Sequence, residues 1–122
     1  MRVLVSTTTA TGASIVQARH GTEVTHMYFP FDIKTCVASC FDRVYPNVII
    51  LIETELWPNF LAVAEERSVP VVLINARLSE KAAARYRRIP HLMRQMLRRL
   101  KLIAAQSTDD AGRFVALGAE RE

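Results

Sequence analysis

Apolar and polar positions divide this sequence into short aliphatic runs and longer segments of mixed polarity. The aliphatic runs have strand length and are rich in β-branched side chains, which predicts strands at 3–7, 24–29, 48–53, 71–76 and 102–106. Between them, apolar residues recur with helical spacing, which predicts helices near 12–19, 33–43, 58–67, 79–100 and 108–117. Repeated strand–helix units of this kind are typical of an α/β fold with a doubly wound parallel sheet.

Residues that start or stop helices agree with this division. Pro58 lies where a first helical turn would begin, and Pro90 divides 79–100 into two helices. Ser107 is a candidate cap for the last helix, and Gly118 follows the end of that helix. The two central aliphatic runs are apolar almost throughout, as expected of parallel strands that are covered on both faces.

The strongest candidate chemistry follows the third aliphatic run, in the sequence ETELWPN. Glu53 and Glu55 come directly after buried positions, where a carboxylate is costly unless water, a ligand or a partner receives it. Ligands of parallel α/β proteins bind beyond the carboxyl ends of the strands, which is where Glu53 is expected. Two readings stay open. Either both carboxylates serve a ligand, or Glu55 caps the next helix and Glu53 pairs with an arginine.

Other polar residues follow the neighbouring runs and are expected at the same edge of the sheet. In TTTATG, Thr11 and Gly12 lead into a helix N-terminus that can hold an anion, unless the hydroxyls only cap that helix. This loop has neither the GxGxxG nor the P-loop spacing, so it carries no nucleotide motif. His26 is either a ligand contact or a partly buried side chain whose hydrogen bonds are satisfied within the protein. No second His or Cys lies at metal-ligand spacing, so no metal site is predicted. Asn75 is a contact or a cap, and the fork of Arg77 suits phosphate or carboxylate.

Charge changes the picture because it is unevenly distributed. The 122 residues carry a net charge of +4, half of them are hydrophobic, and the length suits a single domain. Nine basic residues lie between Arg77 and Lys101, and only Glu80 opposes them, so this tract is expected to attract anions. Phosphorylated lipid, nucleic acid and an anionic membrane surface are all candidate partners at this point.

The segment 91–101 and the length of the apolar runs bear on membranes. The segment 91–101 has an apolar stripe on one side and arginines on the other. This pattern is typical either of a helix docked on the sheet or of a basic helix that lies on anionic lipid. No apolar run approaches the ~20 residues needed to cross a bilayer, and the first residues resemble a strand rather than a secretory signal. The chain is therefore expected to be soluble or peripherally bound.

The order of the motifs TTTATG, HMYFPFD, ETELWPN, NARLS and AAQSTDDAGRFVALGA closely resembles the amino-terminal domain of 3-deoxy-D-manno-octulosonic acid (Kdo) transferase. This resemblance implies the Rossmann-like amino-terminal half of a two-Rossmann-domain glycosyltransferase. That enzyme transfers Kdo from CMP-Kdo to a lipid A precursor, with inversion and without a metal or other cofactor. Glu53 would support the transition state, with Glu55 a second catalytic candidate. The acceptor-binding candidates are Thr11, Gly12, His26, Asn75, Arg77, Arg85 and Arg88.

Two departures from that family limit the expectation. Its general base, a Glu in a Ser-Val-Gly-Glu stretch after an earlier strand, has no counterpart here, and its donor-binding carboxyl-terminal domain is also missing. Residues 1–122 are therefore expected to form a partial acceptor-binding domain that lacks the first strand and is inactive alone. The resemblance also implies a peripheral location at the cytoplasmic face of the bacterial inner membrane. Exposed strand edges are expected to favour self-association.

A second class of function stays open. A nonenzymatic, flavodoxin-like α/β binding module could use the basic tract to hold nucleic acid or a protein partner. Apart from Tyr86, aromatic residues do not interleave with the arginines of this tract, which argues against recognition of single-stranded nucleic acid by stacking. Lipid is therefore the favoured partner, and nucleic acid is not expected.

Overall fold

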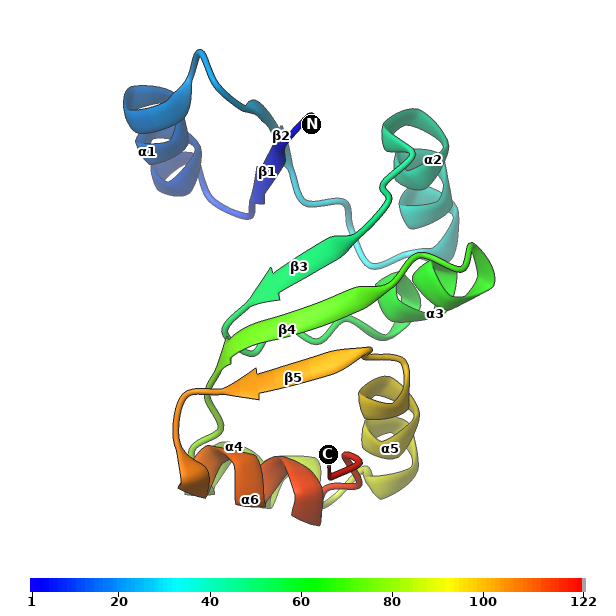
Figure 1. Ribbon diagram of the computed structural model, residues 1–122. Coiled ribbons are helices and arrows are strands. Elements are labelled where there is room, and N and C mark those ends of the chain that lie inside the picture. The colour runs from blue at the N-terminus through cyan, green and yellow to red at the C-terminus, as the bar shows by residue number, and fades with distance from the viewer. Residues whose placement is uncertain (122) are drawn as a thin grey trace. The chain divides into compact units, whose positions relative to one another are not determined.

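The computed structural model describes residues 1–121, in which strands and helices alternate along the chain (Figure 1). The elements are β1 (Leu4–Thr7), α1 (Ala10–His20), β2 (Thr25–Tyr28), α2 (Lys34–Val44), β3 (Ile49–Ile52), α3 (Pro58–Glu66), β4 (Val71–Ala76), α4 (Glu80–Tyr86), α5 (Pro90–Arg98), β5 (Leu102–Ala105) and α6 (Thr108–Ala116). Every strand and helix predicted from the sequence is present within a few residues of its predicted bounds. The prediction of an α/β fold is thereby confirmed.

Local signals at the helix ends explain this agreement. Pro58 and Pro90 occupy the first turns of α3 and α5, where the missing N–H of proline costs least. The Ser107 hydroxyl accepts a hydrogen bond from the N–H of Asp110 at the start of α6. Gly118 follows α6 with a φ of +112°, which glycine adopts without strain.

The chain forms two compact units, of which the first comprises Met1–Phe31. Its strands β1 and β2 pair in parallel, with Leu4 opposite Thr25 and Thr7 opposite Tyr28. Helix α1 contacts both strands. A β-carbon on Gly12 would lie 3.1 Å from the β-carbon of Thr7, so glycine allows the first turn of α1 to approach β1 closely.

The second unit begins at Asp32 and holds the larger core. Its strands β3, β4 and β5 lie side by side and run in the same direction (Figure 1). Leu51 and Leu73, paired across β3 and β4, are buried, as are Leu61 of α3 and Met93 of α5. One face of this sheet is therefore covered by helices, and that face organises the core of the unit.

The opposite face of the same sheet differs from the prediction. Ile50 and Ile52 of β3 are 57% and 60% exposed, and Ile74 of β4 and Leu102 of β5 are also exposed. The apolar runs had predicted strands covered on both faces, but within residues 1–121 these side chains have no such cover. The pattern identified the strands correctly, but it could not tell which neighbour would cover them.

The arrangement of the sheets is the second difference. A doubly wound parallel sheet that lacks its first strand was predicted, and the described part of the chain forms a two-stranded sheet, β1–β2, and a three-stranded sheet, β3–β4–β5. Parallel pairing and the alternation of strands with helices agree with the prediction.

Helix α5 decides between the two readings of the segment 91–101. Met93, Met96 and Leu97 are buried in the core of the second unit, while Arg94 and Arg98 are exposed. The apolar stripe therefore docks inside the protein and is not available to enter a lipid layer. Of the helices within residues 1–121, none is both long and apolar enough to cross a membrane.

Candidate functional site

Polar residues with an unusual backbone conformation end the adjacent strands β3 and β4. Glu53 has a φ of +65° and Asn75 a φ of +50°, in the left-handed region that non-glycine residues rarely adopt. The Glu53 N–H donates a hydrogen bond of 3.0 Å to the Ile74 carbonyl, which ties the two strand ends together. Such conformations persist only where the surroundings enforce them, and they concentrate at functional sites.

The Glu53 side chain is exposed at this strand end, as is that of Glu55. Within residues 1–121, neither carboxylate forms an ion pair or a hydrogen bond. The reading in which Glu53 pairs with an internal arginine is therefore wrong for this part of the chain. The carboxylate faces water, where its charge is not costly and a ligand can reach it.

Helix α3, which begins at Pro58 within ETELWPN, is capped by Asp32 and not by Glu55. The Asp32 carboxylate accepts hydrogen bonds from the N–H groups of Asn59 (3.1 Å) and Phe60 (2.7 Å). In return, the Asn59 side-chain amide donates to the Asp32 carbonyl at 2.7 Å. Asp32 thus satisfies donors in the first turn of α3, and the alternative in which Glu55 caps this helix is wrong.

The loop after β4, which carries Arg77, is held by side chains on both sides. The Thr54 hydroxyl donates to the Arg77 carbonyl and accepts from the Arg77 N–H, the latter at 3.3 Å. On the next residue, the Leu78 N–H donates to the Asp110 carboxylate at 2.7 Å, and the Arg113 guanidinium donates to the Leu78 carbonyl at 3.0 Å. The backbone is therefore fixed while the Arg77 side chain itself is exposed.

Asp110 links this loop to α6 electrostatically. A hydrogen bond from the Ser107 hydroxyl, followed by one from the Leu78 N–H, lowers the pKa of the Asp110 carboxyl from its ordinary value. Arg113, 3.7 Å away, favours the same charged form. Asp110 is therefore ionised at neutral pH and holds the buried residue Leu78 in place.

Two of the predicted acceptor contacts, Arg85 and Arg88, lie on α4 and just after it, and both side chains are exposed. The Arg85 guanidinium lies 6.0 Å from the centre of the Tyr86 ring. Some arginines of the second unit are paired with carboxylates: Arg99 lies 2.7 Å from Glu65, and Arg113 lies 3.0 Å from Glu80. In the described part of the chain Arg77, Arg85 and Arg88 have no acidic partner within ion-pair distance, so their charge is available to an anion.

The remaining candidates belong to the first unit. The Thr9 hydroxyl accepts from the Gly12 N–H at 3.0 Å, which confirms the alternative that hydroxyls of TTTATG cap α1. Thr11 and Gly12 lie in the first turn of that helix. His26 is partly buried, with its Nε2 at 2.9 Å from the Thr7 hydroxyl and its ring edge-on to Tyr28. Thr7, at the end of β1, therefore lies beside both Gly12 of α1 and His26, the second residue of β2.

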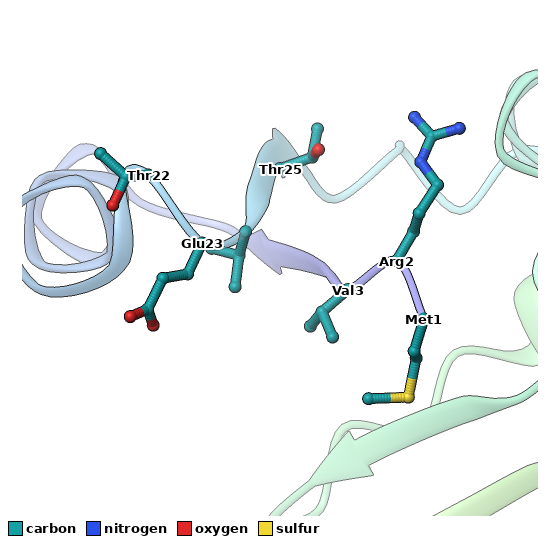
Figure 2. Close-up of a pocket in the computed structure, with 7 residues that line it drawn as sticks. Met1, Arg2, Val3, Thr22, Glu23 and Thr25 are labelled. Atoms are coloured by element: carbon teal, nitrogen blue, oxygen red, sulfur yellow. The ribbon is translucent and has the colours of Figure 1, made fainter.

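A shallow pocket in the first unit lies at the other ends of these strands. Figure 2 shows its lining, which includes Met1, Arg2, Val3, Thr22, Glu23 and Thr25. None of the predicted site residues contributes to it. Since ligands of parallel α/β sheets bind at the carboxyl ends of strands, this pocket is not the candidate site. Within residues 1–121, no group of three or more His, Cys, Asp and Glu side chains is placed to hold a metal ion.

Comparison with known proteins identifies what these motifs resemble. A family model described as 3-deoxy-D-manno-octulosonic-acid transferase (kdotransferase) matches residues 1–122. The chain is 36% identical over its whole length to the 3-deoxy-D-manno-octulosonic acid transferase of Haemophilus influenzae, and covers 29% of that protein. It is 30% identical over 96% of its length to the Bordetella pertussis transferase, covering 28% of it. A probable mitochondrial transferase of Arabidopsis thaliana is 31% identical, with 98% of this chain and 27% of that protein covered. The chain thus spans less than a third of the length of these relatives.

Proposed function

Because the chain belongs to the Kdo transferase family, whose amino-terminal domain it matches over residues 1–122, we propose that it is the acceptor-binding part of such an enzyme. The reaction would move Kdo from CMP-Kdo to a lipid A precursor, at the cytoplasmic face of the bacterial inner membrane. The donor would bind to a separate carboxyl-terminal domain. Residues 1–122 alone would bind the acceptor without transferring sugar to it.

The observation that carries this proposal is the edge formed by the ends of β3 and β4. Glu53 is exposed, lies in a strained backbone conformation, and is connected through Thr54 to the backbone of Arg77. A carboxylate on a backbone that is fixed in this way can stabilise positive charge that develops on the sugar in the transition state. The proposed catalytic role belongs to Glu53, with Glu55 in support.

The acceptor would be recognised chiefly through its phosphates. Arg77, Arg85 and Arg88 are exposed, and in the described residues they are not neutralised by carboxylates. A guanidinium binds a phosphate through two parallel hydrogen bonds, which lysine cannot do. Asn75 is a further proposed acceptor contact on the second unit, and Thr11, Gly12 and His26 stay proposed acceptor contacts of the first unit.

Vesicle binding tests this proposal. Phosphatidylcholine vesicles that contain a bisphosphorylated lipid A precursor should bind the chain, and vesicles with the dephosphorylated lipid should bind it much less. Neutralising Arg85 or Arg88 to Gln should weaken binding about fivefold each, because a basic side chain near an anionic surface contributes ~1 kcal/mol. Arg19→Gln, on the first unit, is the matched control and should have little effect. Equal binding to both vesicles would contradict the proposal.

The alternative function is a nonenzymatic module that holds nucleic acid through the same basic tract. The vesicle-binding assay, with DNA as a competitor, distinguishes this function from acceptor binding. Double-stranded DNA at matched salt should compete poorly if the acceptor proposal is correct. Binding to DNA would be uniform in sequence and would fall steeply with salt. A preference for DNA over the phosphorylated lipid would favour the alternative.

The free edge of β3 supports a proposal about assembly. β3 has β4 as its neighbour within the described sheet, and Ile49–Ile52 contains none of the charges or prolines that usually protect an edge strand. Two copies that pair antiparallel along β3 would bring Glu53 and Glu55 of one copy toward the end of α2 in the other, where Arg43 is exposed. We therefore propose self-association along this edge.

A further inference from the structure

We propose that Thr54 is a positioning residue, which sets the orientation of Arg77 toward the acceptor. This inference rests on the proposed function, in which Arg77 contacts an acceptor phosphate. It adds a residue for which the sequence pattern gave no role. The observation behind it is the pair of hydrogen bonds between the Thr54 hydroxyl and the Arg77 peptide groups.

The Thr54 hydroxyl forms hydrogen bonds with backbone groups just after β4 that β3 would bond if it continued. The β3–β4 ladder closes with the bond from the Glu53 N–H to the Ile74 carbonyl, and beyond that point β3 no longer pairs with β4. β4 continues along β5, where the Gln106 N–H donates to the Ala76 carbonyl. On the side where β3 has ended, the N–H and the carbonyl of Arg77 both meet a single hydroxyl, that of Thr54.

The Thr54 hydroxyl contacts a segment of backbone that would otherwise be held only on one side. Glu53 has a positive φ where β3 ends, and Asn75 has a positive φ within β4, at an irregularity in its pairing with β5. The Thr54–Arg77 contact joins the two segments just beyond these residues. Loss of the hydroxyl would release the Arg77 backbone on that side, while Asp110 and Arg113 would still hold Leu78. The expected result is a mobile Arg77 in a fold that is otherwise intact.

Thr54→Val, which keeps the shape and removes the hydroxyl, is the test, with Thr54→Ser as the conservative variant. Amide hydrogen exchange of the whole chain reports the contact itself. The Arg77 N–H should exchange about tenfold faster in Thr54→Val and nearly normally in Thr54→Ser, because a hydroxyl is enough to accept its hydrogen bond. Ser14→Ala removes a comparable exposed hydroxyl bond, to the Ala10 carbonyl, and should leave Arg77 unchanged. Unchanged exchange of Arg77 in Thr54→Val would overturn the inference.

Vesicle binding then shows whether the contact serves the acceptor. Thr54→Val should weaken binding to the bisphosphorylated precursor about fivefold, and Arg77→Ala should weaken it more. In the Arg77→Ala background, Thr54→Val should have no further effect, because its influence passes through Arg77. A general structural defect would weaken both backgrounds equally, and that result would refute the positioning role. Failure of the unmutated chain to prefer the phosphorylated lipid would instead refute the proposed function, whatever the exchange of Arg77.

Discussion

Replacing Glu53 by glycine should make the protein more stable, although it removes the residue to which catalysis is assigned. Glu53 occupies the left-handed region at a φ of +65°. A non-glycine residue loses about 1–2 kcal/mol there through the clash of its β-carbon with the following carbonyl. Glycine avoids this clash but adds about 0.5–1 kcal/mol of conformational entropy to the unfolded chain. The net gain in the free energy of unfolding is about 0.5–1 kcal/mol.

Thermal and urea unfolding, followed by circular dichroism, measure this gain. A gain of 1 kcal/mol raises Tm by about 4–8 °C in a domain of this size, so Glu53→Gly should raise Tm by a few degrees. Glu53→Ala removes the carboxylate and keeps the β-carbon, and should show no such gain. Ser68→Gly, at a φ of +55° after α3, is the matched control in which the same relief occurs away from the site. If Glu53→Gly were no more stable than Glu53→Ala, the strain argument would be wrong.

Three further changes test other parts of the structure. Asp32→Ala should lower the free energy of unfolding by about 1 kcal/mol in urea titrations, since it removes the cap of α3; an unchanged midpoint would contradict that role. The pKa of Asp110 is lowered in the folded state, so its contribution to stability is present above the unfolded pKa and is lost as the pH falls through the folded value. In urea titrations, the unfolding midpoint of Asp110→Asn should therefore be lower than that of the unmutated chain at pH 7, and the two midpoints should converge in acid. A difference between the midpoints that does not change with pH would contradict this role of Asp110. Ile50→Lys should reduce concentration-dependent association in sedimentation velocity, whereas Val115→Lys, an exposed apolar position on α6, should not; equal behaviour of the two would exclude the β3 edge.

Features that depend on neighbouring residues were predictable from the sequence. Pro58, Pro90 and Ser107 act within one turn of helix, so the bounds of α3, α5 and α6 followed from local rules. The period of the apolar residues identified the strands in the same way. The stripe on α5 was recognised too, and only its burial had to come from the structure.

Features that depend on residues far apart in the chain were not predictable. Asp32 caps a helix that begins 26 residues later, whereas the sequence offered Glu55 for this role as one of two open readings. The positive φ of Glu53 has no local signal, because glutamate gives no preference for the left-handed region. Thr54 stands between Glu53 and Glu55 in the sequence, and no local pattern indicates that its hydroxyl reaches the Arg77 backbone.

The most direct test of the central claim is a nuclear magnetic resonance titration of the whole chain with the deacylated, bisphosphorylated disaccharide of the lipid A precursor. This soluble ligand separates recognition of the phosphates and sugars from any attraction to a lipid surface. The account predicts saturable shifts of the Glu53 carboxyl and the Arg77 guanidinium signals, which the dephosphorylated disaccharide should not reproduce. Saturable binding that leaves both signals unchanged would contradict it.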